Sequence, residues 1–71
     1  MTQCERVLRH MRDYGSITSA EAIHEYGIYR LASRISDLRK SGYRIRKRTV
    51  TGRNRYDEKT AYAEYSIEEE A

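Results

Sequence analysis

The apolar positions of residues 28–42 fall on one face of a helix. Ile28, Leu31, Ile35 and Leu38 recur at intervals of three, four and three residues, which places them on one side of an α-helix. Gly42 follows and is a residue type that commonly ends a helix. The sequence therefore predicts an amphipathic helix. Its opposite, polar face carries Tyr29, Arg30, Ser33, Arg34 and Asp37.

A first helix is predicted over residues 2–14. Thr2 and Glu5 have the spacing of a capping box, and Gly15 can end the helix. Its apolar stripe consists of Cys4, Val7, Leu8 and Met11. The residues off this stripe are expected to be solvated: Arg6, Arg9, His10, Arg12 and Asp13.

A short second helix is predicted from about residue 19 to residue 25, after a brief extended link at residues 16–17. Thr18 and Glu21 repeat the capping-box spacing, and Gly27 provides a tight turn into the next helix. Its best candidates for the core are Ala20 and Ile23, whereas His24 is expected to be exposed.

After Gly42 the apolar period changes from helical to two. Tyr43 and Ile45 alternate with arginines, which predicts a strand with one face buried. Residues 51–59 form a polar loop rich in turn formers, and residues 60–67 alternate again as a second strand. The predicted fold is α+β: three helices followed by a two-stranded antiparallel hairpin, in one domain over residues 1–67 with an acidic tail at 68–71.

The predicted core combines the apolar faces of these elements. It consists of Val7, Leu8, Met11, Ile17, Ile23, Ile28, Leu31, Ile35, Leu38, Ile45, Tyr65 and Ile67.

Charge is distributed unevenly along the 71 residues. Residues 28–59 contain 11 Lys and Arg but 3 acidic residues, a net charge of +8, and the rest of the chain carries −5, for a total of +3. A strongly basic segment favours a polyanionic partner. Cys4 is the only cysteine, so no intrachain disulfide can form. With no apolar run long enough for a signal peptide or a membrane span, we expect a cytoplasmic protein, in a bacterium or an infected host cell.

Other classes of site find little support in the sequence. His10 and His24 belong to different predicted helices, so no metal site is expected. No phosphate-binding glycine loop or nucleophile–base arrangement is present, so we expect neither catalysis nor a cofactor. Cys4 is interpreted as a small core residue.

Nucleic-acid binding accounts best for the basic segment. An α-helix fits the major groove of B-DNA, and arginine is well shaped to bind guanine. Arg30 and Arg34 are therefore predicted to read bases, with Asp37 paired to Arg34 and with Tyr29 and Ser33 reaching bases or phosphates. The hairpin cations are predicted to bind phosphates, with a tip arginine in the minor groove: Arg46, Arg48, Arg53, Arg55 and Lys59.

The segment LASRISDLRKSGYRIRKR resembles the winged helix-turn-helix family, in particular small phage and prophage proteins. The pattern Ile35-x-x-Leu38-Arg39-x-x-Gly42-Tyr43-x-Ile45 is also similar to the DNA-binding domain of biotin-repressor-type regulators. The resemblance implies that the third helix is the recognition helix. It assigns DNA contacts to Arg30, Ser33 and Arg34, and wing contacts to Arg53, Asn54 and Arg55.

The sequence thus predicts a protein that binds specific double-stranded DNA, as a phage or prophage transcriptional regulator or an excisionase-like accessory factor. The alternative is a phage protein-interaction module that uses the same surface to inhibit a host enzyme, such as a nuclease defence complex. The expected partners are double-stranded DNA and, in the alternative, a phage or host protein, without a membrane. The sequence leaves the oligomeric state and the target site open.

Overall fold

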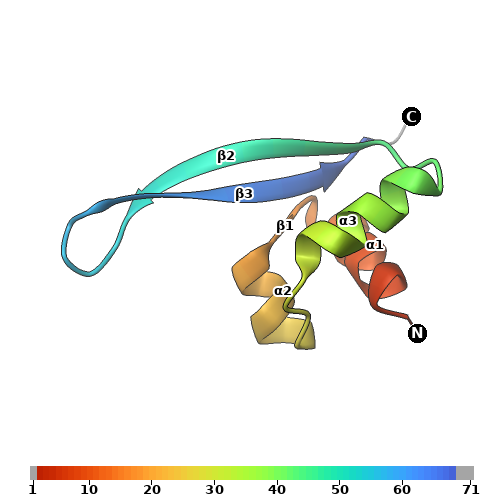
Figure 1. Ribbon diagram of the computed structural model, residues 1–71, viewed down its shortest axis with the longest axis horizontal. Helices are drawn as coiled ribbons and strands as arrows, with labels where there is room; N and C mark the ends of the chain where they lie inside the picture. The colour runs from red at the N-terminus through yellow and green to blue at the C-terminus, as the bar shows by residue number, and fades with distance from the viewer. Residues whose placement is uncertain (1, 69–71) are drawn as a thin grey trace.

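Three helices pack beside the base of a long antiparallel hairpin in the computed structural model, which describes residues 2–68 (Figure 1). The helices are α1 (Gln3–Tyr14), α2 (Ser19–Tyr26) and α3 (Leu31–Lys40), and the strands are β1 (Ile17–Thr18), β2 (Ile45–Arg53) and β3 (Lys59–Ile67). The sheet order is β1-β3-β2, with both pairs antiparallel. The predicted α+β fold is confirmed. Of the predicted acidic tail, residues 69–71 lie outside the described residues.

The predicted starts of the first two helices are confirmed. The Thr2 hydroxyl accepts a hydrogen bond from the Glu5 backbone N–H at 3.2 Å. Thr18 and Glu21 form a complete capping box, with bonds of 3.0 and 3.2 Å between each side chain and the other residue's N–H. These bonds satisfy N–H groups that have no partner inside the helix. Local spacing therefore determines where both helices begin.

The third helix begins three residues later than the apolar spacing predicts, so the assignment of residues 28–30 to it is wrong. Gly27 has a left-handed φ of 67°, and the Ile28 N–H donates to the Ala22 carbonyl at 3.0 Å, which closes the end of α2. Ile28 is nevertheless 1% exposed. A turn residue thus supplies a core side chain at helix-like spacing, and α3 itself starts at Leu31.

The inward face of α2 differs from the prediction. Ile23 is 40% exposed and Ala20 is also exposed, so their assignment to the core is wrong. Ala22 is fully buried instead, and Tyr26, one turn further along the same face, is partly buried. Ala22 belongs to the core cluster, and Tyr26 packs against it.

Most of the predicted core is confirmed. Ile67 is only partly buried, but it packs against the core, as does Cys4. The buried apolar residues of the described chain are Val7, Leu8, Met11, Ile17, Ala22, Ile28, Leu31, Ile35, Leu38, Ile45 and Tyr65.

His10 is 5% exposed, which contradicts the prediction that it is solvated. Its Nδ1 lies 2.7 Å from the Tyr26 hydroxyl oxygen, and its Nε2 lies 3.6 Å from a Glu21 carboxylate oxygen. Burial raises the pKa of Tyr26 above its ordinary value of 10.0. Since buried polar groups need partners, the contact between His10 and Tyr26 fastens α1 to α2.

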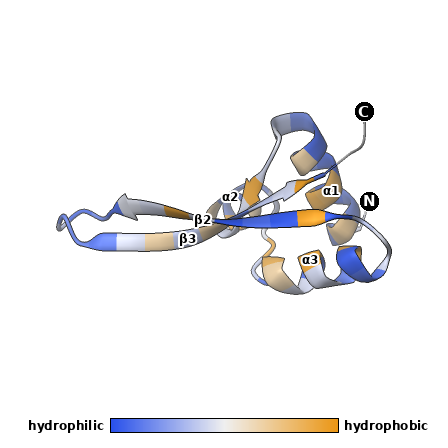
Figure 2. Ribbon diagram, turned by 90° about the horizontal axis from the view of Figure 1, so that it is seen from above, coloured by the Kyte–Doolittle hydropathy of each residue, from blue (hydrophilic) through white to orange (hydrophobic). Residues whose placement is uncertain are grey.

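The sheet contains a third strand, which overlaps the predicted extended link at residues 16–17. β1 pairs Ile17 with Tyr65 and Thr18 with Glu64, and a strand of two residues is too short to show a periodicity. The hairpin is also longer than predicted, because residues 51–53 and 59 belong to its strands. Its hydrophilic end projects well beyond the helices (Figure 2).

No helix within residues 2–68 is both long and apolar enough to cross a bilayer.

Candidate nucleic-acid interface

The polar face of α3 presents a tethered arginine. Arg34 lies 3.3 Å from the Asp37 carboxylate through its Nη2, which confirms the predicted pairing at i,i+3. The Arg34 side chain is 34% exposed, and Ser33 beside it is partly buried. The ion pair restricts the guanidinium to the neighbourhood of the helix, so Arg34 is the predicted base-reading residue whose direction is best defined.

Two predicted contact residues precede α3 instead of lying on its face. Tyr29 is 78% exposed in the connection between α2 and α3. Arg30 is the N-cap, with φ −113° and ψ 60°, and its carbonyl accepts a hydrogen bond from the Arg34 N–H at 3.3 Å. Both side chains are thus at the entrance of the helix, one turn before Arg34. Their directions follow from the connection and not from the helical repeat.

The hairpin cations fall into a paired and an unpaired group. Arg46 pairs with Glu68, Arg48 with Glu64 and Arg53 with Asp57. Within residues 2–68, no ion pair is found for the side chains of the hairpin residues Lys47, Arg55 and Lys59. Because an internal carboxylate competes with a phosphate for the same guanidinium, three of the five cations predicted to bind phosphate are partly neutralised within the chain.

The register divides these cations between the two faces of the hairpin. Directly opposed residues share a face, and Ile45 is opposite Ile67, while Lys47 is opposite the buried Tyr65. The face that carries Lys47 therefore continues the face that packs on the helices. Arg53 and Lys59 are opposite one another on this same helix-side face. The other face holds the pair of Arg48 and Glu64.

A side-chain contact links the end of α3 to the start of the hairpin. The Arg39 Nη2 donates to the Ile45 carbonyl at 3.0 Å. The Glu68 N–H donates to the Arg44 carbonyl at 2.9 Å and extends the pairing at the hairpin base. These bonds fix the base of the hairpin relative to the C-terminal end of α3.

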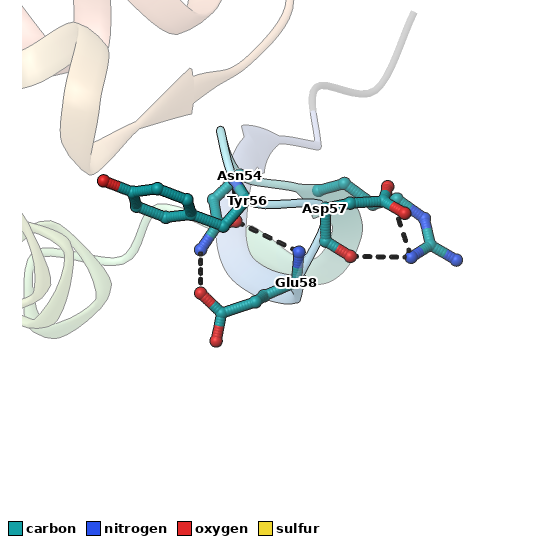
Figure 3. Close-up of polar contacts among 5 residues, drawn as sticks. Asn54, Tyr56, Asp57 and Glu58 are labelled. Atoms are coloured by element: carbon teal, nitrogen blue, oxygen red, sulfur yellow. Dashed lines mark hydrogen bonds and ion pairs between the residues drawn. The ribbon is translucent and has the colours of Figure 1, made fainter.

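Asn54, which was predicted to contact DNA, is the centre of the hairpin turn. Its Oδ1 accepts hydrogen bonds from the backbone N–H groups of Tyr56 at 2.9 Å and Glu58 at 3.1 Å. Asp57 has a positive φ of 62°, and its N–H donates to the Asn54 carbonyl at 3.1 Å. Figure 3 shows the two hydrogen bonds between the Asn54 side chain and Glu58. The Asn54 side chain thus shapes the tip.

Two exposed residues of the hairpin were not predicted from the sequence. Lys47 was not predicted as a contact residue, although the alternation of the strand places its side chain on the face away from Arg46 and Arg48. Tyr56 is 79% exposed at the tip, and no periodic signal distinguishes such a residue within a loop. Among the described residues there is no group of three or more His, Cys, Asp or Glu side chains that could hold a metal ion.

Comparison with known proteins adds one match. Residues 2–70 match a protein family described as winged helix-turn-helix domain. No curated protein matches the chain, and no solved structure does. The family match spans all three helices and the whole hairpin.

Proposed function

This chain belongs to the winged helix-turn-helix family, and from that membership and its polar surface we propose that it binds double-stranded DNA. The segment of Arg30 to Arg34 enters the major groove, where arginine binds guanine O6 and N7. The hairpin is the wing, and its unpaired cations contact phosphates. In this proposal, α3 supplies the sequence preference and the wing supplies the salt-sensitive part of the affinity.

The observation that carries the proposal is the join between α3 and the wing. The Arg39 bond to the Ile45 carbonyl couples the end of the helix to the strand that bears Lys47 on its helix-side face. A helix in one groove and a cationic arm on the neighbouring backbone require this kind of fixed geometry. Non-specific attraction between a basic surface and DNA does not require such a fixed geometry.

A gel-shift measurement tests the proposal. We expect the protein at micromolar concentration to retain a random duplex at low salt, and to select a specific site from a duplex library. The double variant Arg30→Ala, Arg34→Ala should lose sequence preference but keep salt-sensitive background binding. The control Arg6→Ala, Arg9→Ala removes the same charge from exposed positions of α1 and should keep the preference. Absence of retention at low salt refutes DNA binding.

The finer proposal is a phage or prophage regulator or an excisionase-like accessory factor acting in the cytoplasm. Both roles use the same protein–DNA contacts, so the DNA distinguishes them. A regulator protects a promoter in a footprint, whereas an excisionase bends its site and binds cooperatively beside an integrase. A circular-permutation bending assay on the selected site separates the two roles.

The mixed charge of the wing favours a second candidate function, binding to a protein. Arg46, Arg48 and Arg53 each pair with a carboxylate of the chain, and alternating charges suit a protein surface of mixed charge. This candidate predicts no duplex retention in the gel shift, together with loss of partner binding when the wing arginines are replaced.

A further inference from the structure

His10 has a buried ring nitrogen that the rest of the described chain does not satisfy. The residue is 5% exposed, and its Nδ1 lies 2.7 Å from the Tyr26 hydroxyl oxygen. Its Nε2 is buried without a hydrogen-bond partner among residues 2–68, since the Glu21 carboxylate oxygen at 3.6 Å is beyond hydrogen-bond distance. Buried polar atoms are normally paired. The contact with Tyr26 therefore accounts for one nitrogen of the ring and not for the other.

His10 is part of the wall of a pocket between α1 and α2. The pocket has a volume of about 230 Å³. Small-molecule sites usually span about 300–1,000 Å³, so this pocket has room for one side chain and not for a larger ligand. Because the Nδ1 of His10 is turned to Tyr26, Nε2 is the ring nitrogen on the side of Glu21. The residues that form the pocket are His10, Tyr14, Glu21, Glu25 and Tyr26.

The charge of the pocket favours a cation. Glu21 and Glu25 are one helical turn apart on the same side of α2, and both are exposed. One oxygen of Glu21 is used in the capping box, and the other is the oxygen nearer to His10. Among the described residues no Lys or Arg lines this pocket, because Arg6 and Arg9 of α1 line a neighbouring hollow instead.

We propose that this pocket binds one arginine side chain of a partner protein. The Glu21 oxygen and the His10 Nε2 are 3.6 Å apart, close enough for both to accept the paired N–H groups of one guanidinium. In the bound state the Nδ1 of His10 carries the ring proton and donates to the Tyr26 hydroxyl, which leaves the Nε2 lone pair for the ligand. Tyr14 packs on the His10 ring at a centroid distance of 4.7 Å and is 75% exposed. It turns outward to admit the guanidinium and then stacks on it.

The pocket is separate from the surface proposed to bind DNA. None of its five residues is among those assigned to base or phosphate contacts, and its two carboxylates repel a phosphate backbone. The site therefore gives the protein a means of holding a basic protein segment while the third helix and the wing are engaged with DNA. The inference does not depend on DNA binding.

Nuclear magnetic resonance of the His10 ring nitrogens tests the site directly. The probe is N-acetyl-argininamide, which presents the side chain as a protein does, and its matched control is the neutral N-acetyl-citrullinamide. At about pH 8, where imidazole is ordinarily neutral, the arginine probe should shift the Nε2 resonance saturably, with the millimolar affinity that a ligand of this size allows. The citrulline analogue should bind at least about tenfold more weakly.

Variants test the residues of the pocket without removing the core. The double variant Glu21→Gln, Glu25→Gln should weaken argininamide binding at least about tenfold, while the glutamine at 21 keeps the capping-box oxygen. Glu58→Gln is the control, because Glu58 belongs to the turn at the far end of the hairpin from the helices (Figure 1), and it should bind normally. Tyr26→Phe removes the acceptor for the Nδ1 proton, so Nε2 should stay protonated and its shift should be lost.

The outcomes separate this inference from its competitors. An Nε2 resonance that does not move at saturating argininamide, or equal binding of the citrulline analogue, overturns the site and leaves His10 as a structural residue. Tighter binding of free arginine than of the capped probe also overturns it, because the occupant is then a metabolite and not a protein side chain. All of these measurements are made without DNA, so their failure leaves the gel-shift test of the proposed function unaffected.

Discussion

The ion pair of Arg48 and Glu64 makes a counterintuitive prediction: replacing one wing residue should strengthen DNA binding. The Arg48 Nη2 lies 2.7 Å from the Glu64 carboxylate, and the Arg48 side chain is 73% exposed. In Glu64→Gln the guanidinium loses its charged partner but keeps its position on β2. Arg48 should then be free to bind a phosphate.

The size of the effect follows from the exposure of the pair. Exposed ion pairs are worth about 0.2–1 kcal/mol, so removal of the competition should increase affinity by about 1.4- to 5-fold. With Lys47, Arg55 and Lys59 as the wing cations that have no ion pair within residues 2–68, the wing contributes a slope of log K against log salt of about −2.7. One more phosphate contact makes it steeper by about 0.9.

Fluorescence anisotropy with a labelled random duplex, titrated from about 50 to about 200 mM salt, measures both quantities. Glu25→Gln is the matched control, because Glu25 is exposed on α2 and its replacement changes the net charge equally. Identical affinities and slopes for the two variants would show that net charge alone governs binding. The paired and unpaired cations would then be equivalent, contrary to the reasoning above.

Three further predictions concern stability. Leu38→Ala and Ile35→Ala, which truncate buried side chains of α3, should each lower the free energy of unfolding by about 2–5 kcal/mol in urea; less than 1 kcal/mol for both would contradict the packing of α3. Tyr26→Phe should cost about 0.5–1.5 kcal/mol, since it removes the hydrogen bond to His10. Because burial raises the pKa of Tyr26 above 10.0, its contribution is present below pH 10 and lost as the pH rises through the folded-state pKa; alkaline denaturation of Tyr26→Phe should lack this loss.

The parts of the fold that could be predicted depend on residues close together in the sequence. Thr18 and Glu21 are three residues apart, and their capping box fixes the start of α2 without reference to the rest of the chain. The contact of His10 with Tyr26 joins residues 16 positions apart on two helices, and no local pattern reveals it. The prediction that Ile28 is helical was wrong for a related reason, since a buried turn residue satisfies the same apolar spacing as a helical one.

In the candidate site, too, the contacts between residues close in the sequence could be predicted, and those that depend on strand pairing could not. Arg34 and Asp37 are close in sequence, and their pairing was predicted and is confirmed. The partner of Arg48 depends on the strand register, which the sequence does not give. A slip of two residues would place Arg48 opposite Tyr62 or Ser66 instead of Glu64.

The charge pattern of the wing is therefore determined at its tip. The Asn54 hydrogen bonds set the length of the turn, and the turn fixes the register of the two strands. That register brings Glu64 to Arg48 and leaves Lys47 unopposed by an acidic residue. The sequence gives the number of cations in the wing. The turn, through the register, determines which of them have a carboxylate partner within the chain and which can bind a phosphate.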